Sequence, residues 1–408
     1  MYIIVQKFGG TSLAGIDKIR NVANKVKSEY SKGNKIIVVV SAMAGVTNQL
    51  DEYAREASPL ISNESLAEYD SIISSGEQVT SGLLALILQS EGIKARSLLG
   101  WQAGIQTDGF HSKSKIEEIN DKLILDLLDQ GVIPVIAGFQ GVSKQDRLTT
   151  MGRGGSDTTA VAIAAAVNAD RCDIYTDVDG IYTADPGIVP EARRLSKIGY
   201  EEVIEMSSLG AKVLQSRAVS LAYKYNICLQ VLSSFDNKEG TYLVKDETIM
   251  ERRIITAVTD DTSEALITVI QLPNEIGISA ELFKPFAEAE INIDMIIQNI
   301  SQDNKHSNVS FTLHKNDLER GAHILEKNKS KLKYKSYLTN KDVTKISVIG
   351  VGMKTHSGVA QKMFTILADN QINILAITTS EIKISVLVEQ KYSELAVRGL
   401  HKEFKLGN

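Results

Sequence analysis

The chain has 408 residues, of which 43% are hydrophobic and 23% charged, and its net charge is −5. This length exceeds one ordinary core, so we expect two or three domains of a soluble globular type. The acidic balance argues against a nucleic-acid partner, which would require a clustered basic face. No apolar run approaches the ~20 residues that span a bilayer, and no leader pattern precedes the first strand. We therefore expect a cytoplasmic protein without a membrane partner.

The first part of the chain alternates β-branched runs with helical patterns. Buried strands are predicted at residues 2–7, 35–41, 132–139 and 172–176, and helices at residues 15–30 and 157–169. Strands that are apolar on both faces and separated by helices predict a mostly parallel sheet in a three-layer α/β sandwich. Ligands on such sheets bind beyond the carboxyl ends of the strands, which is where the glycine-rich turns of this chain fall.

The C-terminal part contains an internal repeat. Gly277 and Gly358, and likewise Phe283 and Phe364, are separated by the same 81 residues. Each copy has the strand and helix pattern of an α+β ferredoxin-like unit, the first at residues 262–340 and the second at residues 341–408. The second copy ends too soon for its last strand, which we expect residues 253–259 to supply. The polar stretch 234–252 then bounds an N-terminal domain of residues 1–245.

Two glycine-rich turns carry the strongest chemical signals. Lys7-Phe-Gly-Gly-Thr-Ser12 opens the first helix, where backbone N–H groups and a lysine can hold an anion. Met151-Gly-Arg-Gly-Gly-Ser-Asp157 opens the Ala-rich helix, and Arg153 offers a planar fork suited to a carboxylate. Neither turn is a Walker loop or a dinucleotide fingerprint. An ordinary turn with an exposed lysine, and a plain helix cap, remain open as alternatives.

Three further segments end strands or begin helices. Ser41-Ala-Met-Ala-Gly-Val-Thr47 ends the second strand, and Ser75-Gly-Glu77 begins a helix, where Glu77 would by default complement the helix dipole. Thr176-Asp-Val-Asp-Gly-Ile-Tyr-Thr-Ala-Asp-Pro186 lacks the ligand positions of a calcium loop. Its acids and Tyr182 are available to a ribose, a base or magnesium.

Together these motifs resemble those of the amino acid kinase superfamily and, within it, the aspartate kinases. The matching segments are Lys7–Ser12, Val40–Met43, Gly152–Thr159, Thr176–Gly180 and Ser208–Val213, and the repeats resemble ACT domains. The resemblance covers nearly the whole chain in the family's order. It implies phosphorylation of the side-chain carboxylate of L-aspartate by ATP, the first step toward lysine, threonine and methionine.

The resemblance also implies roles for individual residues. The catalytic residues would be Lys7, Asp157 and Lys212, with Asp157 organising two lysines that neutralise the phosphoryl group. Residues expected to bind aspartate are Ser41, Thr47, Glu77 (for the α-amino group), Arg153 (for the α-carboxylate), Gly154, Gly155 and Ser156. Residues expected to bind ATP are Lys7, Gly9, Gly10, Ser12, Thr176, Asp177, Tyr182, Asp185, Pro186 and Lys212. Residues expected to bind an effector are Asn274, Ile278, Asn292, Asp294, Gln298, Met353, Gly358, Val359 and Asn373.

Such chemistry needs no general base, because an aspartate carboxyl group, with an ordinary pKa of about 3.9, is already ionised at pH 7. The cofactors implied are ATP and the Mg²⁺ carried on its phosphates, with no metal held by the protein itself. Lysine or threonine is the expected effector. A homodimer or higher oligomer is expected through the ACT domains, which commonly pair sheet edges between chains.

The sequence departs from the family pattern in two places. Gln215-Ser216-Arg217 stands where the family usually has His-Pro-Arg, and Asn274-Glu-Ile-Gly277 stands where it generally has Asp-x-Pro-Gly. An amide in place of an acid loses the charge that would pair with an effector's ammonium group, so we expect weakened or altered feedback inhibition. A related kinase acting on another carboxylate, and a catalytically silent amino-acid sensor, remain the alternative interpretations.

Overall fold

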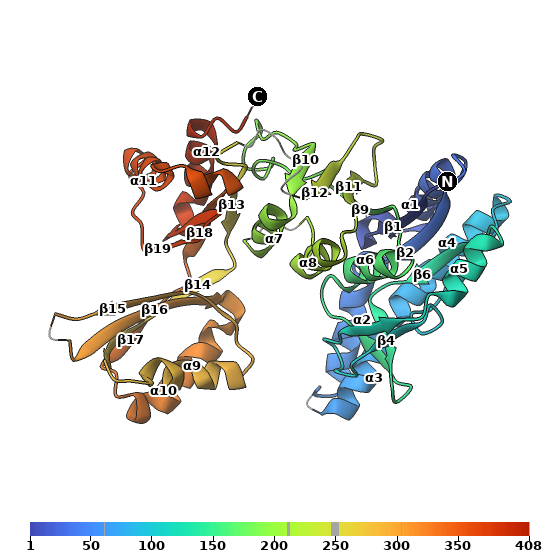
Figure 1. Cartoon of the computed structure of the whole chain (residues 1–408). Helices are drawn as coiled ribbons and strands as arrows, with labels where there is room; N and C mark the ends of the chain where they lie inside the picture. Colours follow the sequence, from blue (N-terminus) through green and yellow to red (C-terminus); the bar gives the residue numbers. More distant parts are fainter. Residues whose placement is uncertain (61, 210–212, 246–252, 303, 408) are drawn as a thin grey trace. The chain divides into compact units, whose positions relative to one another are not determined.

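The computed structural model describes residues 1–60, 62–209, 213–245, 253–302 and 304–407. They form two compact units (Figure 1). The N-terminal unit contains residues 1–181 and 194–207 and the described residues between 213 and 245. The C-terminal unit contains residues 182–193, residues 208–209 and the described residues from 253 onward.

The N-terminal unit is built on an eight-stranded sheet with the order β10-β12-β11-β9-β1-β2-β6-β3. Its strands are β1 (Ile3–Phe8), β2 (Lys35–Val40), β3 (Ala95–Leu98), β6 (Ile133–Ala137), β9 (Arg171–Thr176), β10 (Lys197–Gly199), β11 (Leu229–Ser233) and β12 (Thr241–Val244). Every pairing is parallel except that of β11 with β12. Lys7 lies opposite Val39 of β2 and Ile174 of β9, so β1 is at the centre of the sheet.

Helices cover both faces of this sheet, which confirms the predicted three-layer α/β sandwich. The helices and short 3-10 turn of this unit are η1 (Gly10–Leu13), α1 (Ile16–Tyr30), α2 (Val46–Ala57), α3 (Asn63–Ile73), α4 (Ser75–Ser90), α5 (Lys122–Asp129), α6 (Gly155–Ala166), α7 (Tyr200–Ser208) and α8 (Ser216–Tyr225). α1 and α4 share one apolar core with β1 and β2, whereas α6 packs on the other face of β1. α6 is buried along most of its length because it is nearly all alanine, threonine and small apolar residues.

A small four-stranded sheet leads into the glycine-rich turn before α6. It has the order β5-β4-β7-β8 and consists of β4 (Ile105–Thr107), β5 (Ile116–Ile119), β7 (Gln140–Ser143) and β8 (Leu148–Thr150). β7 and β8 form an antiparallel pair in which Gln140 lies opposite Thr150. The sequence patterns did not single out this sheet.

α3 and α4 form an almost continuous helical stretch, Asn63–Ser90. By length and composition alone this stretch would suffice to cross a membrane, yet half of its most apolar window is buried inside the protein. Asp70 and Glu77, both buried, lie within it. Burial of acidic side chains against the rest of the unit is the behaviour of a core helix rather than of a lipid-facing one.

The C-terminal unit contains two ferredoxin-like sheets, as the internal repeat predicts. One has the order β15-β16-β14-β17 and the other β13-β18-β20-β19. The first copy consists of β14 (Glu264–Pro273), α9 (Ile278–Glu288), β15 (Ile293–Ile300), β16 (His306–His314), η3 (Lys315–Asp317), α10 (Leu318–Leu332) and β17 (Ser336–Asn340). The second consists of β18 (Val343–Ile349), η4 (Val351–Thr355), α11 (Val359–Asp369), β19 (Ala376–Thr379), β20 (Lys383–Glu389), η5 (Gln390–Tyr392) and α12 (Ser393–Glu403). In each copy both helices lie on one face of the sheet (Figure 1).

The repeated glycines have a common structural reason. Gly277 and Gly358 precede α9 and α11 with φ angles of 90° and 93°. Residues other than glycine rarely adopt this left-handed conformation, so each copy needs glycine where its first helix begins.

β13 (Ala257–Asp261) precedes the first copy in sequence but belongs to the sheet of the second. It pairs antiparallel with β18, Ala257 lying opposite Ile349. The strand therefore lies a few residues later than the expected 253–259. The first copy is enclosed, in sequence, between β13 and the rest of the second copy.

Candidate functional site

Lys7 and Asp157 form an ion pair at the carboxyl end of the central strand. The Lys7 ammonium lies 2.6 Å from Asp157 Oδ1, and the two side chains are 12% and 10% exposed. Lys7 reaches this position from β1, and Asp157 from the first turn of α6. The ion pair with Asp157 holds the Lys7 side chain in one direction in a largely buried place, which suits it to meet a second anion.

The turn that follows β1 is shaped by close backbone approaches. A Cβ atom on Gly10 would lie 2.8 Å from the carbonyl oxygen of Ala42, and the Ala44 N–H donates to the Gly10 carbonyl at 3.1 Å. Ser12 contacts Ser234, which follows β11, through their hydroxyl groups at 2.5 Å. The Gly9 N–H also donates to the Tyr175 carbonyl of β9 at 3.3 Å. Gly9, Gly10 and Ser12 thus lie beside the ends of β9, β2 and β11, respectively.

The second glycine-rich turn packs against the ends of β2 and β6. Gly154 directly precedes α6 with a φ of 72°, and a Cβ on Gly155 would lie 2.8 Å from the Phe139 ring. Ser156 is nearly buried and lies against Gly138, where a Cβ would come within 2.9 Å of it. Arg153, in contrast, is exposed. The turn is therefore tightly packed at its glycines and presents one exposed cation.

Glu77 differs from the dipole-complementing acid that its position predicts by default. The side chain is 3% exposed, and Oε1 accepts a hydrogen bond from the Ala42 N–H at 3.0 Å. Oε2 is buried and has no donor among the described residues. Burial raises the pKa of Glu77 from 4.5 to about 7, against the opposing effect of the Ala42 N–H. A buried carboxylate with one unused oxygen is suited to a cationic group of a ligand.

The residues that follow β2 pack against the start of α4, the helix that carries Glu77. Thr80 Oγ1 donates to the carbonyl of Ser41 at 2.8 Å, and Gly76 leaves room for Ala42, because a Cβ there would lie 2.7 Å from the Ala42 methyl group. Thr47 lies in the first turn of α2 and is partly exposed. Ser41, Thr47 and Glu77 thus belong to segments that contact one another or follow directly in sequence.

The residues expected to bind ATP divide between the two units. In the N-terminal unit Thr176 ends β9 and its hydroxyl donates to Asp177 at 3.0 Å. Tyr182, Asp185 and Pro186 belong to the C-terminal unit. In that unit Asp185 accepts the Gly187 N–H at 2.8 Å.

Lys212 lies outside the described residues. After it, Gln215 precedes α8 and packs directly on Gly154, where a Cβ would lie 1.9 Å from its side chain. Arg217 donates to the carbonyls of Ser114 at 3.1 Å and Met151 at 3.3 Å. The departure from the family's His-Pro-Arg therefore touches the Arg153 turn directly.

Sequence reasoning missed a buried polar cluster around Asp70. Asp70 is fully buried in α3 and accepts hydrogen bonds from His111 Nδ1 at 2.8 Å, from the Ser112 N–H at 3.0 Å, and from Thr150 Oγ1 at 2.5 Å. These residues lie 41 to 80 positions from Asp70, and no local motif marks them. The sequence signal is weak: Asp70 shares the buried face of α3 with Ala67 and Ile73, three residues before and after it.

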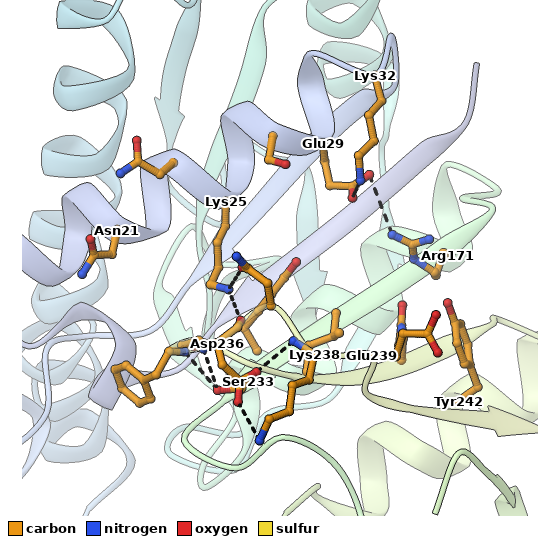
Figure 2. A pocket seen from close by; sticks show the side chains of 18 residues that line it. Asn21, Lys25, Glu29, Lys32, Arg171, Ser233, Asp236, Lys238, Glu239 and Tyr242 are labelled. Carbon is orange, nitrogen blue, oxygen red and sulfur yellow. Dashed lines mark hydrogen bonds and ion pairs between the residues drawn. The ribbon is translucent and has the colours of Figure 1, made fainter.

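A hollow of about 790 Å³ lies between α1 and the β11–β12 segment (Figure 2). Its cations have partners within the protein. Lys25 donates to the Asp236 carbonyl at 2.6 Å (Figure 2). Arg171 pairs with Asp173, and Lys238 pairs with Asp179. None of the residues predicted for the site lines this hollow. The charges here stabilise β9 and the segment after β11.

The expected effector residues lie at matching places in the two ACT copies. Ile278 and Val359 begin α9 and α11, Gly358 precedes α11, and Asn292 and Asn373 precede or lead into the next strands. Asn274 follows β14 and donates to the Asn304 carbonyl at 3.0 Å, Gln298 lies opposite Val309, and Met353 lies in η4.

Asp294 has a partner that the sequence did not suggest. Its carboxylate lies 2.5 Å from the ammonium of Lys345, which is 1% exposed and also contacts Glu264 at 3.0 Å. Lys345 belongs to β18 of the second copy, whereas Asp294 and Glu264 belong to the first. One buried cation therefore joins the two ACT copies.

Comparison with known proteins follows the same division of the chain. The amino acid kinase family model matches residues 2–233, and an ACT domain model matches residues 267–328 and 346–404. Aspartate kinase from Pseudomonas putida is 46% identical over 408 residues, which is 100% of this chain and 98% of that protein. Aspartokinase from Corynebacterium glutamicum is 41% identical over 411 residues, with 100% and 97% covered.

Solved structures of aspartokinases are similar to this chain over nearly its whole length. Escherichia coli aspartokinase III in complex with aspartate and ADP superposes with a TM-score of 0.81 at 27% identity, covering 98% of this chain and 99% of that one. The same enzyme in complex with lysine and aspartate gives a TM-score of 0.78 at 27% identity, again covering 98% and 99%. With full-length relatives above 40% identity and an ordered set of matching motifs, the chain belongs to the aspartate kinases of the amino acid kinase family.

Proposed function

We propose that the chain transfers the γ-phosphoryl group of ATP to the side-chain carboxylate of L-aspartate, with Glu77 and Arg153 recognising the α-amino and α-carboxylate groups. The observation that carries the substrate is the unused, buried oxygen of Glu77. A substrate ammonium group beside it would supply the missing donor and favour the ionised carboxylate. Acetylglutamate has no free ammonium group, so the same carboxylate would disfavour it.

On the acceptor side, the reaction needs charge neutralisation rather than proton removal. The aspartate carboxylate is already an anion at pH 7, and it must approach the anionic γ-phosphate. Lys7 is held by Asp157 at 2.6 Å near the end of β1, and its ammonium lies 3.5 Å from where a Cβ on Gly9 would be. Phosphoryl transfer depends mainly on such positioning and on stabilising the charge of the transferred group.

The nucleotide is assigned to the glycine-rich turn after β1, to Thr176 and Asp177, and to Tyr182, Asp185 and Pro186. Lys212 is proposed as a second phosphate-neutralising lysine. Mg²⁺ would be carried on the phosphates and would neutralise part of their charge. Among the described residues no group of three or more His, Cys, Asp or Glu side chains could hold a metal ion of its own.

Regulation by lysine or threonine, assembly and location are parts of the same proposal. E. coli aspartokinase III has been solved with lysine bound, which supports a lysine effector. β15 and β19 are sheet edges, and the exposed Ile296, Ile300 and Ile377 lie on them, which supports a homo-oligomer formed by the ACT domains. We place the domains at residues 1–245, 262–340 and 341–408, and the enzyme in the cytoplasm.

The substrate assignment is tested by ADP release with a panel of acceptors. We expect ATP turnover with L-aspartate and only background turnover with glutamate, acetylglutamate or no acceptor. Faster turnover with one of these other acceptors would show that this acceptor, and not aspartate, is the preferred substrate. No turnover with any acceptor, together with thermal stabilisation by amino acids, would favour an amino-acid sensor.

A further inference from the structure

The carboxylate of Asp70 lies between two parts of the chain that the proposed function assigns to the substrate. Asp70 is on α3, one turn before the junction with α4, and the Ser74 N–H donates to the Asp70 carbonyl at 3.1 Å. Glu77 lies in the first turn of α4. Asp70 is therefore part of the helical stretch that carries the proposed receptor for the substrate ammonium group.

On its other side, Asp70 holds the strand that leads into the Arg153 turn. Thr150, which donates to Asp70 Oδ1 at 2.5 Å, is the last residue of β8 and is followed at once by residues 151–155 of the turn. Thr150 is fully buried, as is Asp70. A buried carboxyl group needs hydrogen-bond partners, and the chain supplies them from β8 and from residues 111 and 112.

Residues 111–114 form a second layer behind the same turn. His111 and Ser112 donate to Asp70, and Ser114 donates to the Thr150 carbonyl through both its N–H and its hydroxyl at 2.9 Å. Gly152 lies against the Ser112 carbonyl, since a Cβ there would be 3.1 Å from it. Through its hydrogen bonds to Asp70 and Thr150, this layer fixes the backbone path of the turn at residues 151–155.

A second bond ties the same two parts together. Gln140 Nε2 donates to the Ser74 carbonyl at 2.9 Å, and Gln140 lies opposite Thr150 in the β7–β8 pair. Both links connect the α3–α4 junction with the β7–β8 hairpin, and both are buried. The positions of Glu77 and of the Arg153 turn are thus set by one shared network.

We propose that Asp70 is a positioning residue for substrate recognition, which fixes the spacing between Glu77 and the turn that carries Arg153. The inference rests on the proposed function, because it takes these two residues as the receptors of the α-amino and α-carboxylate groups. An α-amino acid presents these groups at a fixed separation, so two receptors that move independently bind it poorly. Misplacement by about 1 Å can cost on the order of 100-fold in a well-oriented site.

The test compares Asp70→Asn and Thr150→Val with a matched control, Asp51→Asn. Asp51 lies in α2 and accepts a hydrogen bond from Tyr69 of α3 at 2.7 Å. It resembles Asp70 in joining α3 to another element, but it has no contact with β8. For Asp70→Asn we expect the KM for aspartate to rise about tenfold or more, with kcat and the KM for ATP changed by less than about threefold. Thr150→Val should show a smaller rise. The double variant should be no worse than Asp70→Asn, because both changes disrupt the same hydrogen-bond network around residue 70.

An aspartate KM within about twofold of wild type in a folded Asp70→Asn or Thr150→Val variant would overturn the inference. So would a fall in kcat with both KM values unchanged. If Asp70→Asn does not fold, Thr150→Val alone decides, since it removes one hydroxyl and keeps the shape of the side chain. The wild type is assayed in parallel: without aspartate-dependent turnover there, the proposed function fails and takes this inference with it, whereas an active wild type isolates the role of Asp70.

Discussion

Replacing Glu77 by glutamine distinguishes two effects of its buried carboxylate, namely the loss of folding stability and the contribution to aspartate binding. A pKa raised from 4.5 to about 7 corresponds to about 3 kcal/mol against the ionised form in the free protein. Because the pKa in the folded protein is raised, the associated stability is complete below pH 4.5 and is lost as the pH rises through 7. Glu77→Gln should therefore raise the melting temperature of the free protein at pH 8, by roughly 5–10 °C for a unit of this size. At pH 4.5 or below the difference should disappear.

The same substitution should weaken aspartate binding. Removing one partner of a buried charged pair costs about 2–5 kcal/mol, so the KM for aspartate should rise about 100-fold or more, with a much smaller change in the KM for ATP. In the wild type the substrate ammonium group competes with a proton for Glu77 below pH 7. The aspartate KM should then rise by up to about tenfold per pH unit on acidification, and Glu77→Gln should remove this dependence.

Melting curves at pH 8 and pH 4.5 and initial rates between pH 5.5 and 8 provide the measurements. A stabilised variant with an unchanged aspartate KM would show that Glu77 is buried for another reason. A variant that is destabilised at pH 8 would contradict the assignment of the raised pKa to burial.

Three further predictions concern other parts of the molecule. Gly10→Ala brings a Cβ within 2.8 Å of the Ala42 carbonyl oxygen. By displacing the glycine-rich turn after β1, it should reduce kcat/KM for ATP at least tenfold. Full activity in initial-rate assays would show that this turn adjusts without loss of function. Lys345→Met leaves the carboxylates of Asp261, Glu264 and Asp294 without their buried cation. It should destabilise the C-terminal unit by about 3–5 kcal/mol, seen as a lower urea midpoint, and an unchanged midpoint would contradict this prediction. Asn274→Asp restores the acid expected of the family's effector loop and should lower the lysine or threonine concentration needed for half inhibition; strong inhibition of the wild type at submillimolar effector would refute the premise.

Much of the fold follows from local sequence patterns. β2 is a run of β-branched residues, β1 begins with one, and most residues of β1, β2 and β9 are buried. The order of these strands with α1 and α6 predicts a parallel sheet. The ACT copies were predictable because Gly277 and Gly358 repeat at a helix start that requires a positive φ. Lys7 and Asp157 meet because each lies at the end of an element on the same edge of the sheet.

The features that the patterns did not predict depend on contacts between distant residues. Asp70 receives its donors from residues 41 to 80 positions away, and Lys345 meets Asp294 across the two ACT copies. The segment 182–193 is another case. Ala184 and Val189 are buried in the core of the second ACT copy, and Thr183 contacts His401 of α12 at 2.9 Å. A local pattern specifies the secondary structure of such a segment but not its partner.

Trapping of the acyl phosphate by hydroxylamine tests the central claim most directly. The wild type, with ATP and L-aspartate, should form aspartate β-hydroxamate in step with ADP. Lys7→Ala should lose this product, whereas Lys27→Ala, which removes an exposed lysine paired with Glu91, should keep it. Hydroxamate that persists at the wild-type rate in Lys7→Ala would contradict the phosphate-neutralising role of the lysine. ADP release by the wild type without any hydroxamate would contradict phosphoryl transfer to the aspartate carboxylate.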